Sequence, residues 1–264
     1  MLKALLTHPL TRGLDIDSPE TTNLRRRIVA EKKFLRRVYE EWYQNLANHI
    51  PKDGGKVIEI GSGAGFMKNF LPDLITSDIL PLEGIDLVLN GADLPFEDGA
   101  LRGLVMTNVL HHIPNTPQFF REAGRCMRVG GRMAFLEPWV SGWSKKIYTK
   151  LHHEPFETEA PTWEFPEGGP LSTANGALPW IIFGRDRARF EREFPEWRVS
   201  LIQPSMPFRY LMSGGVSMRS LMPNWAFGFW KWVEEKAIRK KERWAMFAYI
   251  VVERVAPPAV PLAA

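Results

Sequence analysis

The amino-acid sequence predicts an α/β fold, in which a mostly parallel sheet of seven strands carries helices on both faces. The first observation behind this prediction is an alternation of short apolar runs with helical patterns between residues 56 and 136, which is typical of parallel strands joined by helices. The second is a pair of apolar runs near the end of the chain, which add two strands. Hydrophobic residues make up 45% of the 264 residues, enough for a packed core.

The individual elements follow from hydrophobic periodicity and from residues that start or end helices. A long amphipathic helix is expected from Ser18-Pro19 to about Ile50, and Gly130-Gly131 is expected to form a turn. Further helices are predicted at 117–127, 144–152 and 185–194. The predicted strands are Lys56–Ile60, Leu74–Ser77, Ile85–Leu89, Gly103–Thr107, Arg132–Leu136, Trp197–Gln203 and Trp244–Glu253.

Charge and cysteine content disfavour some classes of protein. The formal net charge of +4 is too small to argue for nucleic-acid binding, so no nucleic-acid partner is expected. The single cysteine, Cys126, excludes an intrachain disulfide and fits a reducing cytoplasm. No run of about 18 consecutive apolar residues occurs, so no segment is expected to span a membrane.

The most informative segment is Val57–Phe66, in which a strand runs into glycines at positions 61, 63 and 65. A glycine directly after a strand permits a tight turn, and the next one lets the backbone approach a ligand. The dinucleotide-binding fingerprint needs its third glycine at position 66, which is Phe66 here, so a nicotinamide oxidoreductase is disfavoured. Glu59 lies two residues before the first glycine, and Asp78 closes the second strand 17 residues after it.

Three further motifs follow in order, DLPFEDG at 93–99, VMTNVLHHI at 105–113 and FREAGRCMRVGG at 120–131. Together with the glycine loop, this series resembles the class I S-adenosylmethionine-dependent methyltransferases of the type 11 group, over about residues 55–138. Motifs that occur in the same order are more specific than any one of them. The resemblance implies a Rossmann-like fold, S-adenosyl-L-methionine as the cofactor and methyltransferase activity.

The resemblance also implies which residues bind the cofactor. The glycine loop would wrap the methionine and ribose, Glu59 would lie near the amino group, and Asp78 would hold the ribose hydroxyls. Asp93 would bond the adenine amino group with the Leu94 backbone at a ring nitrogen, and the floor near the methionine would include Asn108. The full set is Glu59, Gly61, Ser62, Gly63, Gly65, Asp78, Asp93, Leu94 and Asn108.

Methyl transfer from a sulfonium requires alignment and exclusion of water, and a general base only where the acceptor loses a proton early. His111 and His112 are the candidate catalytic bases, because they follow the fourth strand at the edge where ligands bind in such sheets. The alternative is that one imidazole only packs or caps this loop. Glu137, at the end of the fifth strand, could face the substrate or bond a backbone group. A second cluster, His152-His153-Glu154, lacks further ligand spacing, so no metal is expected.

The predicted organisation places one sheet across most of the chain. Its parts are 1–50, an N-terminal cap segment and long helix; 51–138, the S-adenosylmethionine-binding core; 139–196, a lid and helices; 197–255, the C-terminal strands of the same sheet with an aromatic helical insertion at 206–243; and 256–264, a flexible tail. The first seventeen residues could fold over the cofactor, with Arg12 or Asp15 nearby.

The aromatic insertion contains a predicted helix at 223–241, rich in tryptophan and phenylalanine and followed by lysine and arginine. An exposed helix of this kind would suit an anionic membrane surface or a lipid-linked acceptor. A buried one would pack on the domain or cover an apolar pocket. Burial is favoured, because tryptophan and phenylalanine are most often buried, and a peripheral membrane contact through 223–243 is the second interpretation.

The predicted function is in-line transfer of a methyl group from S-adenosylmethionine to an oxygen or nitrogen of a small or lipid-linked acceptor. The expected location is the cytoplasm, with possible association to a membrane. The alternative is a non-catalytic cofactor-binding or membrane/partner interaction module on the same fold. Nothing in the sequence names the acceptor or indicates an oligomeric state.

Overall fold

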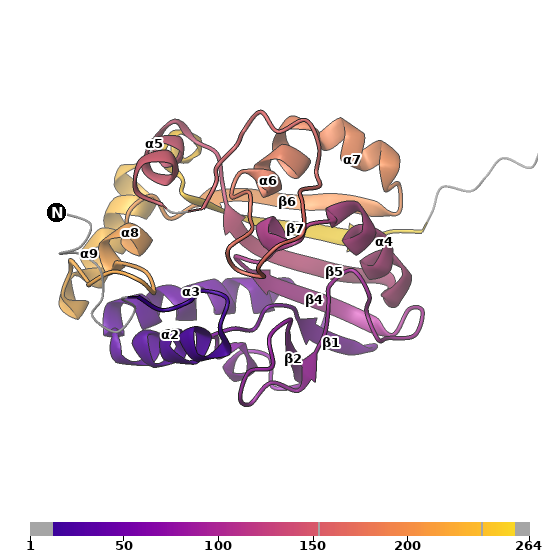
Figure 1. The fold of residues 1–264 in the computed structure, drawn as a ribbon. Coiled ribbons are helices and arrows are strands. Elements are labelled where there is room, and N and C mark those ends of the chain that lie inside the picture. The colour runs from indigo at the N-terminus through magenta and orange to yellow at the C-terminus, as the bar shows by residue number, and fades with distance from the viewer. Residues whose placement is uncertain (1–12, 153, 239, 257–264) are drawn as a thin grey trace, which may run out of the picture.

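One seven-stranded sheet forms the centre of the protein, in the order β3-β2-β1-β4-β5-β7-β6 (Figure 1). The computed structural model describes residues 13–152, 154–238 and 240–256. Strands β1 to β5 pair in parallel, and β7 runs antiparallel between β5 and β6, which confirms the predicted fold class. The strands are β1 (Lys56–Glu59), β2 (Leu74–Asp78), β3 (Leu87–Val88), β4 (Leu101–Thr107), β5 (Met127–Pro138), β6 (Trp197–Ser205) and β7 (Phe247–Arg254).

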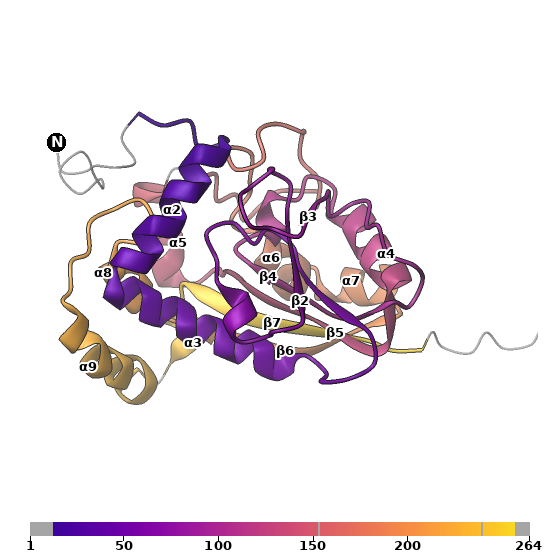
Figure 2. The same ribbon diagram turned by 90° about the horizontal axis from the view of Figure 1, so that it is seen from below.

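Helices cover both faces of the sheet. Figure 2 looks at the face that α3 (Lys33–His49) covers, where Trp42 lies 5.2 Å from the Phe247 ring of β7. On the opposite face, Phe120 of α4 (Thr116–Cys126) packs edge-on against Phe190 at 5.0 Å. The central strands are therefore buried on both sides, and β4 is buried from its first residue to Met106.

The remaining helices surround this core. They are α2 (Pro19–Glu31), α5 (Gly142–Leu151), α6 (Leu178–Trp180), α7 (Arg187–Glu193), α8 (Arg209–Ser213), α9 (Phe227–Trp232) and α10 (Lys241–Trp244). Short 3₁₀ or π turns lie at Met67–Asn69, Leu110–His112, Ile181–Arg185, Asn224–Ala226 and Val233–Ala237. Every helix within the described residues is too short or too polar to cross a membrane.

The predicted long helix from 18 to 50 is two helices, and this is a correction. Ser18 caps the first one as expected, since its hydroxyl accepts a hydrogen bond from the Thr21 amide at 3.2 Å. The helix ends at Lys32, whose ammonium donates to the carbonyl oxygens of Gly215 at 2.5 Å and Met218 at 2.9 Å. These partners lie more than 180 residues away, so no local pattern marked the break.

Two smaller predictions also differ from the structure. The expected turn at Gly130-Gly131 is a bulge inside β5, which begins at Met127 and shifts register against β4. The third strand is shorter than predicted, and just before it the Thr76 amide donates to the Asp86 carboxylate at 2.8 Å. Arg12, most of the N-terminal cap segment and nearly all of the predicted tail lie outside the described residues.

Candidate functional site

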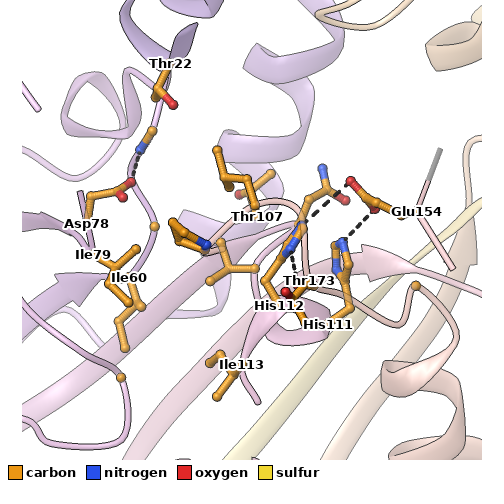
Figure 3. Close-up of a pocket in the computed structure, with 18 of the residues that line it drawn as sticks. Thr22, Ile60, Asp78, Ile79, Thr107, His111, His112, Ile113, Glu154 and Thr173 are labelled. Carbon is orange, nitrogen blue, oxygen red and sulfur yellow. Dashed lines mark hydrogen bonds and ion pairs between the residues drawn. The ribbon is translucent and has the colours of Figure 1, made fainter. Parts of the chain in front are cut away.

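A cavity of about 540 Å³ lies where β1, β2, β4 and β5 reach their carboxyl ends. Its wall includes the loop after β1, residues 78–80 after β2, residues 107–115 after β4, and parts of the 154–177 loop. Figure 3 shows Asp78 at one end of this cavity and the side chains of His111, His112 and Glu154 at the other. One continuous space therefore joins the predicted cofactor loop to the predicted catalytic histidines.

The glycine loop owes its shape to backbone conformation and close packing. Gly61 has a φ of +68°, and a Cβ there would lie 2.5 Å from a methyl carbon of Val109. A Cβ on Gly65 would lie 2.5 Å from the Tyr43 hydroxyl, so this position also requires glycine. The amide of Ser62 donates to the Ser77 carbonyl at 2.8 Å, which ties the loop to the end of β2.

Asp78 holds this loop from the next strand. Its carboxylate accepts hydrogen bonds from the Gly63 amide at 2.9 Å and the Leu80 amide at 3.0 Å. Burial raises the pKa of Asp78 more than these backbone hydrogen bonds lower it. The side chain lines the cavity, so the carboxylate that positions the loop can also contact a ligand.

Glu59 is a buried carboxylate at the start of the loop. Burial, reinforced by the charge of Asp78, raises its pKa to about 7 against a hydrogen bond from Ser62. Among the described residues, its Oε2 atom has no hydrogen-bond partner, and the same holds for Oδ1 of Asn108. Both residues line the cavity, and Asn108 has a φ of 57°. Buried polar atoms without partners are costly, so these oxygens fit a ligand that donates to them.

Asp93 and Leu94 do not line the cavity. Asp93 is exposed, and the amide of Leu94 donates to the carboxylate of Glu122 at 3.3 Å. After β3 the chain turns back through a bridge between Asn90 and Asp93, which brings Asn90 and Ala92 to the wall instead. The structure therefore separates these two residues from the other predicted cofactor residues.

His111 is held between two carboxylates. Its Nδ1 lies 2.7 Å from Glu137 Oε2, and its Nε2 lies 3.4 Å from Glu154 Oε2. The other oxygen of Glu137 accepts from the amides of Val109 and Leu110, both at 2.8 Å. Burial lowers the pKa of His111, but the hydrogen bonds and charges of Glu137 and then Glu154 raise it to about 9.

His112 lies beside His111, with 4.3 Å between the ring centroids. Its Nδ1 lies 3.2 Å from the Thr173 carbonyl oxygen, and its Nε2 lies 3.9 Å from Glu154 Oε1. Burial, followed by the charge of His111, lowers its pKa to about 3. Both ring nitrogens of each imidazole face polar atoms from distant segments.

Glu137 and Glu154 complete the cluster, although the sequence assigned neither a definite role. Glu137 accepts from backbone amides, as one of its two predicted alternatives stated, and also from an imidazole. Glu154 belongs to the cluster of 152–154, of which residue 153 lies outside the described residues. A carboxylate next to two histidines was the signal that pointed to it. Besides the nearby His152 at 3.6 Å, its partners are His111 and His112, more than 40 residues earlier.

The 154–177 loop is tied down over the cavity. Asp17, just before α2, accepts from the amides of Leu171 at 2.7 Å and Ser172 at 2.9 Å. The Asn175 amide donates to the His111 carbonyl at 3.0 Å. The segment before α2 and this loop therefore close one side of the cavity together.

The aromatic insertion exposes more of its rings than expected. Phe227 is buried and packs on Phe34 at 5.2 Å, but the side chains of Trp225, Phe229 and Trp232 are 83%, 59% and 57% exposed. The favoured prediction of burial is therefore wrong for these three. The helix is also divided, with α9 between the turns at 224–226 and 233–237.

Comparisons with known proteins point to one family. Residues 32–202 match the family described as a methyltransferase domain. An uncharacterised protein of Methanocaldococcus jannaschii is 31% identical over 104 residues, which are 36% of this chain and 50% of that protein. The chain thus spans about half the length of the curated relative that it matches.

Solved structures share the fold. Geranyl diphosphate C-methyltransferase from Streptomyces coelicolor A3(2), in complex with Mg²⁺, geranyl diphosphate and S-adenosyl-L-homocysteine, aligns with a TM-score of 0.53 at 15% identity, over 95% of this chain and 90% of its own. A chain from the complex between the Trm112 methyltransferase activator and a methyltransferase of Haloferax volcanii aligns with a TM-score of 0.52 at 12% identity, over 88% and 98%. Identities this low show a common fold and nothing finer.

Proposed function

Because this chain belongs to the methyltransferase domain family of class I S-adenosylmethionine-dependent methyltransferases, we propose that it methylates an oxygen or nitrogen of a small or lipid-linked acceptor. The observation that carries this proposal is the single cavity that runs from the glycine loop to the His111–His112 pair. A cofactor at one end and an acceptor at the other would meet inside this space, away from bulk water.

The residues at the glycine-loop end fit S-adenosylmethionine. Glu59, with its unpaired buried oxygen, would accept from the ammonium group, and Asp78 would accept from the ribose hydroxyls. The backbone of Gly61, Ser62, Gly63 and Gly65 would follow the methionine and ribose, and Asn108 would contact the methionine from below. For the adenine, Asn90 and Ala92 take the place first assigned to Asp93 and Leu94, because only the former pair lines the cavity.

The bound cofactor supplies a methyl group on a positively charged sulfur, so the chain mainly has to orient the acceptor and receive its proton. His111 and His112 are proposed to lie beside the acceptor atom. An acceptor hydroxyl or amine that loses a proton would transfer it to the neutral imidazole of His112, because a pKa of about 9 keeps His111 protonated at neutral pH. Glu137 is a positioning residue, since it holds Nδ1 of His111 at 2.7 Å and does not itself line the cavity.

A lipid-linked acceptor is supported by the exposed aromatic surface, defined as Trp225, Phe229 and Trp232. The exposed cations Lys236, Lys240 and Arg243 follow it. Indole and phenyl rings beside basic side chains are typical of segments that lie in the interface of an anionic membrane. The same surface would serve the alternative function, a non-catalytic module that binds a membrane or partner.

Calorimetric titration with S-adenosyl-L-methionine and S-adenosyl-L-homocysteine tests the proposal. We expect the wild type to bind both and Asp78→Ala to lose at least tenfold in affinity, about 1.4 kcal/mol, because the ribose hydroxyls lose a charged acceptor. Asp93→Ala is the matched control, since this carboxylate is exposed and outside the cavity wall.

Equal affinity of Asp78→Ala and wild type would refute the assignment of the site. Binding of both ligands without methyl transfer to any acceptor, together with flotation on anionic vesicles, would favour the non-catalytic module.

A further inference from the structure

The two histidines of the cavity have the same hydrogen-bonding arrangement. Nδ1 of His111 faces a carboxylate oxygen of Glu137, and Nδ1 of His112 faces the Thr173 carbonyl oxygen. A carbonyl oxygen only accepts, as does an ionised carboxylate, so each Nδ1 carries the proton that forms the bond. In the neutral imidazoles, the Nε2 atoms then present lone pairs.

Both Nε2 atoms face the same carboxylate. Nε2 of His111 lies 3.4 Å from one oxygen of Glu154, and Nε2 of His112 lies 3.9 Å from the other. One ligand atom from each of the three residues lies within 4.8 Å of the other two. A tetrahedral Zn²⁺ with bonds of about 2.0–2.1 Å separates its ligand atoms by roughly 3.4 Å, so only small side-chain shifts separate this arrangement from a coordination shell.

The surroundings match those of a metal site. Ligand histidines usually donate their second ring nitrogen to a carboxylate or backbone carbonyl, and this is what Glu137 and Thr173 accept. Glu137 is itself fully buried and held by two backbone amides. Glu137 and Glu154 bring two carboxylates into a poorly solvated place, where Nδ1 of His152 also lies 3.6 Å from Glu154, and a divalent cation would add positive charge beside them.

We propose that His111, His112 and Glu154 bind a divalent transition-metal ion of the Zn²⁺ class, which departs from the expectation of no metal. Two imidazoles and one carboxylate are a donor set that such ions favour. All three residues line the cavity, so a fourth coordination position opens toward the acceptor end. With a metal bound, its charge rather than a free imidazole lowers the pKa of an acceptor hydroxyl. The binding itself does not depend on the proposed methyl transfer.

The test is metal binding by the full chain after removal of metals with a chelator. We expect one equivalent of Zn²⁺ by calorimetry, and the visible absorption bands of four-coordinate Co²⁺ when Co²⁺ replaces it. Glu154→Gln should weaken Zn²⁺ binding by at least about 100-fold, since it removes a ligand rather than a residue that only orients one. His112→Ala should abolish the Co²⁺ bands. Glu157→Gln is the matched control, because this carboxylate lies on the same loop, is exposed and does not line the cavity.

Two results would overturn the proposal. One is a wild type that binds no stoichiometric Zn²⁺, which would leave His111 as an imidazolium paired with the two carboxylates. The other is Zn²⁺ binding that Glu154→Gln leaves unchanged, which would place the metal elsewhere. Titration of the same samples with S-adenosyl-L-homocysteine reports on the cofactor site separately, so failure of either proposal is seen independently of the other.

Discussion

Lowering the pH should weaken cofactor binding through Glu59. Burial raises the pKa of this carboxyl to about 7 in the free protein, so it is mostly protonated below neutral pH. Asp78 from β2 and Tyr43 from α3 are the titratable groups that face it. An ammonium group placed beside Glu59 favours the charged form, so binding should release a proton wherever the free protein holds one.

The size of this loss of affinity follows from the pKa of Glu59. Each pH unit below it costs about tenfold in affinity, or about 1.4 kcal/mol, as long as Glu59 stays charged in the complex. Affinity for S-adenosyl-L-homocysteine should therefore be constant above pH 8 and fall roughly 30-fold between pH 8 and pH 5.5. Near pH 6, calorimetry in buffers of different ionisation enthalpy should record the release of close to one proton.

Two controls isolate the effect. Glu59→Gln keeps the shape of the side chain but cannot titrate, so its affinity should be weak and independent of pH. Adenosine lacks the ammonium group, so its binding to the wild type should also be independent of pH. Wild-type affinity for S-adenosyl-L-homocysteine that stays constant from pH 8 to pH 5.5, or a Glu59→Gln variant with the wild-type slope, would refute the reasoning.

Three other predictions follow from the packing. Gly61→Ala should lower the free energy of unfolding by about 1–2 kcal/mol more than Gly99→Ala in chemical denaturation. Both glycines have a positive φ, but of the two only Gly61 has another side chain where a Cβ would lie. Equal losses in the two variants would contradict the predicted overlap. Replacing Trp225 and Trp232 by serine should remove most of the flotation on anionic vesicles. The free energy of unfolding should change by less than about 0.5 kcal/mol, since both rings are exposed. Unchanged flotation would exclude this surface as the membrane contact. Asp17→Ala should speed deuterium exchange in the loop over the cavity by an amount that corresponds to about 1 kcal/mol of lost protection. The reason is that the amides of Leu171 and Ser172 lose their acceptor. Unaltered exchange would show that other contacts hold the loop.

The parts of the fold that the sequence predicted well depend on local patterns. The strand, turn and glycine spacing of residues 57–66 and the acid at Asp78 lie within about twenty positions of each other, and parallel strands bring their carboxyl ends to one edge. Cys126 likewise lies buried in α4 as its helical pattern indicated. Periodicity is sufficient in these cases, because the partner of each residue is a neighbour in sequence or on the adjacent strand.

The predictions that failed depended on distant partners. The helix break at Lys32 lies where its ammonium contacts carbonyl oxygens near residue 215. In the aromatic insertion, Phe227 is buried against Phe34, whereas Trp225, Phe229 and Trp232 remain exposed. A hydrophobicity pattern identifies rings that can be buried, but it contains no information on how much surface the core offers them.

The sequence by itself determined the fold class, the glycine loop and the carboxylates beside it, because strand–turn–helix geometry places those residues wherever the pattern occurs. Only the tertiary structure decided what His111 and His112 contact. Their partners Glu137 and Glu154 come from the neighbouring strand and from a loop that folds back over the sheet. Which carboxylate meets which imidazole depends on the strand register and on the path of that loop, and both are set by packing across the whole chain.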